Sequence, residues 1–181
     1  MAHPPVDIAI PDPSVVVLVG AAGVGKSTFA RRHFAPDEIL SSDAFRALIA
    51  GDEADQTATV AAFRALHRAL ERRLAAGLLT VVDATNVTAR ARRGILRLAS
   101  AAGLPAVALI LDLPTEEVLA RNAGRARVVP EGAVRSHVAD LRRALATGTL
   151  AKEGFAHVIR LGSAGEMDAA RVVRVAGKAA G

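Results

Sequence analysis

Residues 14–28 read SVVVLVGAAGVGKST, and most of the architecture can be worked out from this stretch. Its first part, Ser14–Val19, is a short, β-branched apolar run, which is typical of a strand buried on both faces of a parallel sheet. Its second part, residues 20–28, matches the phosphate-binding pattern G-x-x-x-x-G-K-[ST] in full. The match lies between a predicted strand and a predicted helix, as the pattern requires. The sequence therefore predicts a P-loop.

The P-loop predicts a site for the triphosphate tail of ATP or another nucleoside triphosphate. Its glycines allow backbone amides to approach the phosphates, and the helix that follows directs its positive end at the anion. Lys26 is expected to contact the β- and γ-phosphates, and the Ser27 hydroxyl to ligate Mg²⁺. A glycine turn that binds no nucleotide is the alternative, which the complete motif disfavours. The expected nucleotide-binding residues of the loop are Gly20, Ala21, Ala22, Gly23, Val24, Gly25, Lys26, Ser27 and Thr28.

Four further apolar runs alternate with stretches of helical periodicity, and this alternation predicts a parallel sheet with crossover helices. We expect an α/β, three-layer P-loop fold with a parallel sheet of about five strands and helices on both faces. The further strands are predicted at Glu38–Ser41, Leu78–Val82, Val107–Leu111 and His157–Leu161. The helices are predicted at Lys26–Phe34, Ala44–Ile49, Thr57–Ala76, Ala89–Ala102, Thr115–Asn122, Glu131–Ala146 and Glu166–Ala176.

Length and composition suggest one domain. With 181 residues, 51% of them hydrophobic, the chain can close a single core. We therefore expect one domain over residues 1–181, with a short proline-containing extension over residues 1–13. Cysteine is absent, which excludes disulfides, thiolate zinc sites and a cysteine nucleophile. No signal peptide is recognisable and no apolar stretch reaches the roughly 18 residues of a membrane span, so a cytoplasmic protein without a membrane partner is expected.

The formal charge of +5 would suit a polyanionic partner such as nucleic acid. Only three of the 23 basic residues are lysine, and alanine is abundant, so a coding bias toward arginine and alanine explains the charge equally well. The sequence has no tryptophan or tyrosine and five phenylalanines, which leaves little material for stacking on bases. Nucleic-acid contacts are therefore expected mainly at phosphates.

The segment SSDAFR, residues 41–46, follows a predicted strand and begins a predicted helix, at the sheet edge where ligands of parallel α/β folds bind. Asp43 and Arg46 are three residues apart and share a face if the helix begins at Asp43. An unpaired Asp43 carboxylate near the γ-phosphate would accept a hydroxyl proton, and Arg46 would hold a phosphate of the acceptor. The alternative is that Asp43 caps the helix and Arg46 is solvated.

Two further segments carry candidate residues. Asp83 ends an apolar strand in TVVDATN, residues 80–86, where an aspartate commonly holds Mg²⁺ or its water shell; the alternative is a turn built from Asp, Thr and Asn. Arg121, Arg125 and Arg127 surround Gly124 between two predicted helices, without a nearby acid. Such a segment could close over the triphosphate, whereas the alternative is a solvated basic loop.

Other conspicuous residues receive structural interpretations. The five histidines show no metal-ligand spacing and are expected on the surface or at the edge of the core. In the predicted helix over residues 57–76, an apolar stripe at intervals of three and four residues is expected to pack on the sheet. The stripe consists of Phe63, Leu66, Leu70 and Leu74.

Four segments resemble, in order and spacing, the 5′-hydroxyl polynucleotide kinase domain of bacterial polynucleotide kinase-phosphatases. These are VVVLVGAAGVGKSTFARRHF (15–34), EILSSDAFR (38–46), TVVDATN (80–86) and ARNAGRARVVPE (120–131). The resemblance runs from about Ile8 to Leu161 and includes the intervening residues 51–80. It differs at Ala22 and Val24, since a serine is often present at one of these positions. Members of that family usually continue into phosphatase and nucleotidyltransferase domains, for which this sequence has no motifs, so neither 3′-end healing nor ligase coupling is inferred.

The resemblance implies a role for each matching residue. Lys26 and Ser27 would bind phosphate and Mg²⁺, and Asp83 would lie near the metal. Asp43 would act as the general base on the 5′-hydroxyl, and Arg46 would contact the neighbouring acceptor phosphate. The lid over the ATP phosphates would contain Arg121, Arg125 and Arg127.

Three functions remain open from the sequence. The first is an ATP-dependent kinase of DNA or RNA 5′-hydroxyl ends, with nucleic acid as partner. The second is a P-loop kinase of a small molecule such as a sugar, an antibiotic or a nucleotide sugar. The third is an ATP-binding switch without catalysis, against which Asp43 and Arg46 argue because a switch needs no acceptor base. The basic charge and the extent of the resemblance favour the first.

Overall fold

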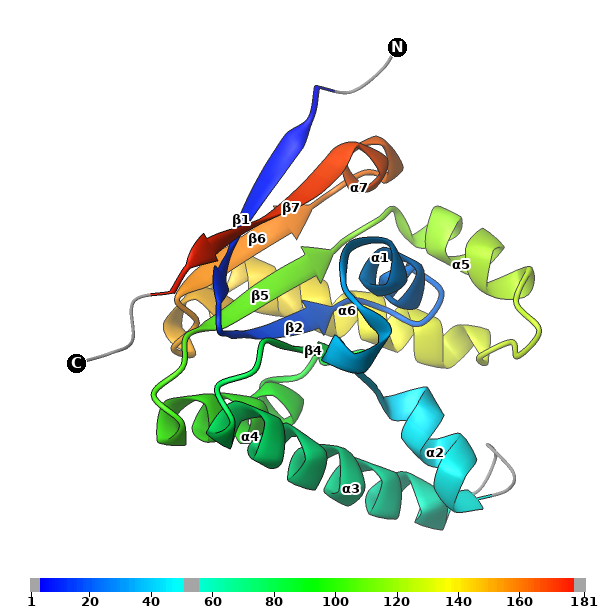
Figure 1. The fold of residues 1–181 in the computed structure, drawn as a ribbon. Coiled ribbons are helices and arrows are strands. Elements are labelled where there is room, and N and C mark those ends of the chain that lie inside the picture. Colours follow the sequence, from blue (N-terminus) through cyan, green and yellow to red (C-terminus); the bar gives the residue numbers. More distant parts are fainter. Residues whose placement is uncertain (1–3, 51–55, 178–181) are drawn as a thin grey trace.

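The computed structural model describes residues 4–50 and 56–177, so that His3 and residues 51–55 of the resembling segment lie outside it. Its centre is a five-stranded, fully parallel sheet with the order β3-β4-β2-β5-β6 and helices on both faces (Figure 1). The predicted α/β fold is thus confirmed. The strands of this sheet are β2 (Val15–Val19), β3 (Ile39–Ser41), β4 (Thr80–Asp83), β5 (Ala106–Leu111) and β6 (His157–Leu161).

The helices lie close to their predicted positions, with one exception described below. They are α1 (Lys26–His33), α2 (Ser42–Ala50), α3 (Gln56–Ala75), α4 (Ala89–Ala101), α5 (Thr115–Ala123), α6 (Glu131–Ala146) and α7 (Ala164–Ala169). Two short 3₁₀ helices, η1 (Pro36–Glu38) and η2 (Leu150–Lys152), complete the connections. Gly77 and Gly103 follow α3 and α4 at φ +67° and +65°, the left-handed conformation that commonly ends a helix.

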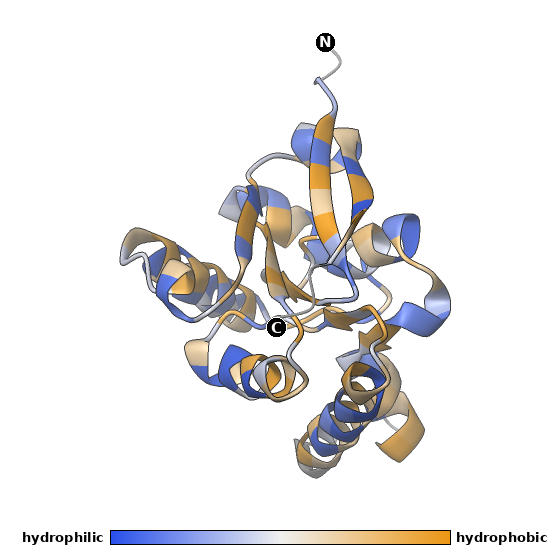
Figure 2. Ribbon diagram, turned by 60° about the vertical axis from the view of Figure 1, so that its left-hand side comes forward, coloured by the Kyte–Doolittle hydropathy of each residue, from blue (hydrophilic) through white to orange (hydrophobic). Residues whose placement is uncertain are grey.

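Each face of the sheet has its own apolar core, because the strand side chains alternate between the faces. On one face, Val16 and Leu18 of β2 pack with α1, α5 and the amino-terminal half of α6. On the other face, Val15, Val17 and Val19 pack with α3 and α4. All five residues of β2 are fully buried, as the apolar run predicted. Figure 2 shows the sheet strands predominantly apolar and the helices striped with hydrophilic residues.

The order of the strands places the P-loop at a position suited to ligand binding. β4 and then β3 lie on one side of β2 in the sheet. After β4 the chain crosses over, so that β5 pairs with the other side of β2. Such a reversal of winding opens a crevice at the carboxyl ends of the strands. The P-loop follows β2 directly at this point.

Both ends of the chain differ from the sequence-based prediction. Residues 1–13 were expected to be an extension, but Val6–Asp12 forms strand β1, whose Ile8 and Ile10 are buried in the core. The helix expected at Glu166–Ala176 ends at Ala169, and Ala170–Ala176 forms strand β7. β1 and β7 pair in parallel over their whole length as a separate two-stranded sheet. Each of these two strands obtains its backbone hydrogen-bond partners from the other. The periodicity of either segment alone does not reveal this pairing.

The apolar stripe of α3 is also only partly buried. Leu66, Leu70 and Leu74 are at most 2% exposed, whereas Phe63 is 37% exposed. Its position in the stripe was therefore predicted correctly, but not its burial. No helix within residues 4–50 and 56–177 has the length and apolarity to cross a membrane.

Candidate functional site

The P-loop joins β2 to α1 and is held by close backbone contacts. The amide of Gly20 donates to the carbonyl of Thr85 at 2.9 Å, which ties the loop to the end of β4. A Cβ at Gly20 would lie 2.7 Å from the carbonyl oxygen of Leu111, so no larger residue fits there without a shift. Gly23 has φ +88° and lies against Asn122 of α5, which explains the glycine in this position as well.

Lys26 is the first residue of α1 and is buried within the loop that precedes it. Its Nζ donates to the carbonyl oxygens of Gly20 at 2.9 Å and Ala21 at 2.8 Å. Burial lowers the pKa of Lys26 from 10.5 to about 8, while the Asp83 carboxylate opposes this shift and the Arg125 charge adds to it. An arriving phosphate would favour the charged ammonium, so binding of an anion and protonation of Lys26 are coupled.

Ser27 and Asp83 meet where the two candidate metal-binding segments converge. The Ser27 hydroxyl donates to Oδ2 of Asp83 at 2.6 Å, across 56 residues of sequence. Burial raises the pKa of Asp83, although the Ser27 hydrogen bond and the Lys26 charge act in the opposite direction. The described residues contain no cluster of three or more His, Asp or Glu side chains that could hold a metal alone. A hydroxyl and one carboxylate nevertheless fit Mg²⁺ in such sites, because Mg²⁺ takes few protein ligands and shares the substrate phosphates.

Asp43 and Arg46 lie in the first turns of α2, which begins at Ser42, two residues before the predicted start at Ala44. They share a face as expected, and a guanidinium nitrogen of Arg46 forms an ion pair with the Asp43 carboxylate. The expectation of an unpaired Asp43 carboxylate is therefore wrong. The carboxylate is paired, although 48% of the Asp43 side chain is exposed. The cap of this helix is contributed by Ser41, whose hydroxyl accepts from the amide of Ala44 at 3.4 Å.

The arginine segment, which runs from Arg121 in the last turn of α5 to the start of α6, lies beside the P-loop. Arg121 donates to the Val24 carbonyl at 3.5 Å and to the Glu117 carboxylate at 2.8 Å. The expectation of no nearby acid is thus wrong for Arg121, because Glu117 lies one helical turn earlier on α5. Arg125 lies close enough to Lys26 for its charge to lower the pKa of that lysine. Whether this segment moves as a lid stays a prediction.

One cavity of about 720 Å³ brings these groups together, in the range of small-molecule sites. Its wall includes the P-loop, Asp43, Asp83 and the arginine segment from Arg121 to Pro130. Six basic side chains face two carboxylates there, so the cavity favours an anionic ligand. The basic residues are Lys26, Arg31, Arg46, Arg121, Arg125 and Arg127.

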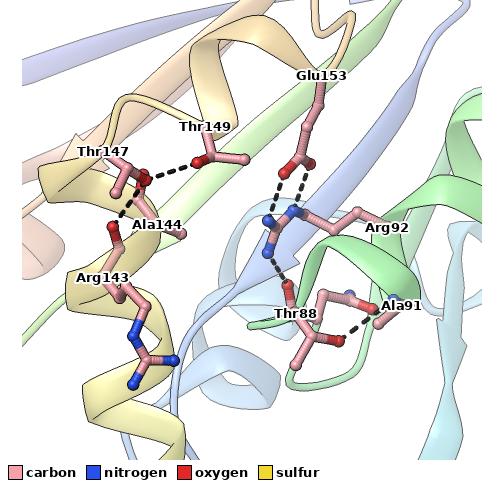
Figure 3. Close-up of polar contacts among 9 residues, drawn as sticks. Thr88, Ala91, Arg92, Arg143, Ala144, Thr147, Thr149 and Glu153 are labelled. Atoms are coloured by element: carbon pink, nitrogen blue, oxygen red, sulfur yellow. Dashed lines mark hydrogen bonds and ion pairs between the residues drawn. The ribbon is translucent and has the colours of Figure 1, made fainter.

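A buried ion pair supports the loop that lies behind this cavity. Arg92 of α4 is fully buried and forms a two-pronged pair with Glu153 at 2.6 and 2.7 Å (Figure 3). Arg92 also donates to the carbonyl of Asn86 at 2.7 Å. The Asn86 side chain, in turn, donates to the carbonyl of Leu18 in β2 at 2.9 Å. These bonds fix residues 84–87, whose Thr85 carbonyl holds the P-loop.

Among the residues that line the cavity but that sequence reasoning did not find are Arg31, Phe63 and His137. Phe63 had been placed in the core, and His137 at the surface or the core edge. His137 projects from α6, and its Nδ1 atom is buried without a hydrogen-bond partner among the described residues. Burial lowers the pKa of His137, and the nearby Lys26 charge lowers it further. No spacing signal marked Phe63 or His137, because each reaches the cavity through the tertiary arrangement of its helix.

A family model described as an AAA domain matches residues 15–147, which contain the sheet strands β2 to β5 and every residue of the cavity. The chain belongs to the AAA domain family. The match covers more than half of the chain and includes the P-loop, both candidate acidic residues and the arginine segment. No curated protein matches this AAA domain chain.

Solved structures resemble this AAA domain protein in fold. The Pnkp1/Rnl/Hen1 RNA repair complex contains a chain with a TM-score of 0.65 and 24% identity, covering 76% of this chain and 47% of that one. The chain thus spans about half the length of that relative. A sugar kinase from Janibacter sp. HTCC2649 has a TM-score of 0.54 and 22% identity, covering 83% and 85% of the two chains.

The APS kinase of Mycobacterium tuberculosis, solved with AMPPNP and APS, has a TM-score of 0.53 and 18% identity, covering 88% of this chain and 95% of that one. At these identities the likeness shows the fold alone. The chain therefore has the fold that these kinases share.

Proposed function

We propose that this protein is an ATP-dependent polynucleotide 5′-hydroxyl kinase, which transfers the γ-phosphate of ATP to the 5′-hydroxyl end of DNA or RNA. The observation that carries the proposal is the shared cavity of the P-loop and the Asp43–Arg46 pair. A nucleotide-binding switch needs a P-loop but has no use for a carboxylate and a guanidinium in the same cavity. A phosphotransferase needs both, because its acceptor must be deprotonated and positioned.

The donor half of the site would be formed by the P-loop. Backbone amides of residues 20–28 would cradle the phosphates, and the Lys26 ammonium would turn from its two carbonyl partners toward the β- and γ-phosphates. Ser27 and Asp83 would hold Mg²⁺, which neutralises phosphate charge that develops during transfer. Arg121 and Arg125 would add positive charge from the opposite side of the tail.

The acceptor half would be formed by α2. As the 5′-oxygen attacks the γ-phosphorus, Asp43 would accept its proton. The new oxygen–phosphorus bond forms while the bond from the γ-phosphorus to the β,γ-bridging oxygen breaks, so that ADP leaves. Arg46, which pairs with Asp43 in the described structure, would hold the acceptor phosphate next to the 5′-end.

Two features support a polynucleotide acceptor over a small molecule. The cavity wall is strongly basic, and the whole chain carries a formal charge of +5. Both suit an acceptor that continues as a polyanion beyond its reacting end. The similarity to a sugar kinase and to an APS kinase keeps a small-molecule acceptor as the second candidate.

We also propose a single domain and a cytoplasmic location, in line with the length and the absence of cysteine.

An acceptor panel tests the proposal. The protein is incubated with γ-labelled ATP and Mg²⁺ and offered a 5′-hydroxyl oligonucleotide, its 5′-phosphorylated counterpart or a set of sugars and nucleotide metabolites. Label on the 5′-hydroxyl oligonucleotide alone supports the proposal. Label on a metabolite but on neither oligonucleotide would replace it with the small-molecule kinase, and ATP binding without transfer would indicate the switch.

A further inference from the structure

Phe63 is exposed where the pattern of its helix predicts burial. It continues the stripe formed by Leu66, Leu70 and Leu74, yet 37% of its surface is exposed while these leucines are at most 2% exposed. Its side chain lines the same cavity as the P-loop, Asp43 and Arg46. Leaving much of a large phenyl ring in contact with water forgoes the free energy of its burial.

The lengths of the elements explain this exposure. α3 has 20 residues and is roughly 30 Å long at about 1.5 Å per residue. β4, which follows it, has four residues and spans only about 13 Å. In a right-handed crossover the helix runs antiparallel to the strands, so the first turns of α3 extend past the carboxyl edge of the sheet. Phe63 belongs to the amino-terminal half of α3, and α3 packs against α2 (Figure 1).

Phe63 is distinct among the phenylalanines of the chain. Phe29 and Phe34 are at most 5% exposed and pack in the core, and Phe45 and Phe155 pack against the core on the α3–α4 side. Within the described residues, the cavity wall contains a single phenyl ring, and the sequence has no tyrosine or tryptophan. The other aromatic ring of the described cavity wall is the imidazole of His137 on α6, so Phe63 is the one large apolar ring that a planar group would meet there.

We propose that Phe63 stacks on the base of the terminal nucleoside of the acceptor. The inference rests on the proposed function, since α2 carries Asp43 and Arg46 and packs on α3. An acceptor with its 5′-oxygen near Asp43 presents its sugar and base to the wall that these two helices form. Stacking on an aromatic face is tolerant of base identity, so this contact selects for the presence of a base at the 5′-end. The acceptor is then recognised by a base as well as by phosphates.

The test compares acceptors with and without the terminal base. The kcat/KM for an intact 5′-hydroxyl oligonucleotide and for one with an abasic 5′-terminal residue is measured for the wild type and Phe63→Ala. Loss of a base stack corresponds to roughly 5- to 150-fold in affinity. We expect the wild type to prefer the intact acceptor by a factor in this range, and Phe63→Ala to lose that preference while the KM for ATP stays constant.

Two further variants separate stacking from structural effects. Phe63→Tyr retains an aromatic face and is expected to restore the preference for the intact acceptor. Val60→Ala, on the same helix and 55% exposed outside the cavity wall, serves as the matched control and is expected to behave as wild type. If Phe63→Ala keeps the wild-type preference, or loses activity equally on both acceptors, the stacking role is wrong while the kinase assignment stands. If neither the wild type nor any variant phosphorylates an oligonucleotide, the proposed function itself fails.

Discussion

The lowered pKa of Lys26 makes nucleotide binding sensitive to pH between 7 and 9. In the free protein, burial lowers this pKa from 10.5 to about 8. Phosphate oxygens favour the ammonium form, so bound nucleotide raises the pKa again. The complex therefore holds a proton that the free protein loses above pH 8, and by linkage the affinity falls as the pH rises through this value. Below pH 7 the ammonium is present in both states, and this contribution to the pH dependence disappears.

The magnitude follows from the fraction of charged Lys26. With a pKa of about 8, the ammonium form is roughly 90% populated at pH 7 and roughly 10% at pH 9. If only this form binds, the dissociation constant rises about tenfold over the interval, which corresponds to about 1.4 kcal/mol. The chain has no cysteine, whose thiol ordinarily titrates near pH 8.5, so no thiol contributes in this range.

Isothermal titration calorimetry with a non-hydrolysable ATP analogue and Mg²⁺ at pH 7, 8 and 9 provides the measurement. Buffers of different ionisation enthalpy would report the proton taken up on binding at pH 9. Lys26→Arg serves as the control, because a guanidinium keeps its charge throughout and should flatten the pH dependence. An unchanged wild-type dissociation constant from pH 7 to 9, without proton uptake, would refute the reasoning.

Two further predictions concern the acceptor base and the buried ion pair. Asp43→Asn should reduce phosphoryl transfer by roughly 10²- to 10⁴-fold in a steady-state assay while calorimetric ATP affinity stays within error, and wild-type turnover would rule out the role of Asp43 as base. Glu153→Ala leaves the fully buried guanidinium of Arg92 without its partner, so it should destabilise the protein by about 3–5 kcal/mol in urea unfolding. Arg143→Ala, which removes an exposed pair, should cost no more than about 1 kcal/mol, and equal effects of the two variants would contradict the assigned importance of burial.

The parts of the fold that depend on local sequence were predictable. β2 and the P-loop follow from a run of five apolar residues and a fixed motif, and the ends of α3 and α4 follow from Gly77 and Gly103. These signals act within a few residues of the feature that they specify. The meeting of Ser27 with Asp83 was also predictable in outline, because all strands of a parallel sheet end at the same edge.

The features that depend on distant partners were not predictable from local pattern. The segment from Ala170 to Ala176 reads ARVVRVA, and its mixture of arginine, valine and alanine suits either a helix or a strand. Only pairing with Val6–Asp12 decides between them. Phe63 has the period of a core residue, but its exposure depends on how far the sheet extends beneath α3. The sequence around Arg92 suggests an exposed residue on a polar helix face. Its burial depends on the ion pair with Glu153, which lies 61 positions later in the sequence.

The most direct test of the central claim is to determine where the γ-phosphate goes. A 5′-hydroxyl oligonucleotide is reacted with ATP and Mg²⁺ to completion, ADP is quantified, and the oligonucleotide is examined by mass spectrometry after fragmentation. The account predicts one phosphate for each ADP formed, carried as a monoester on the 5′-terminal residue, with none on an oligonucleotide whose 5′-end is already phosphorylated. ADP formation with an unmodified 5′-end, or a phosphate at any other position, would contradict it.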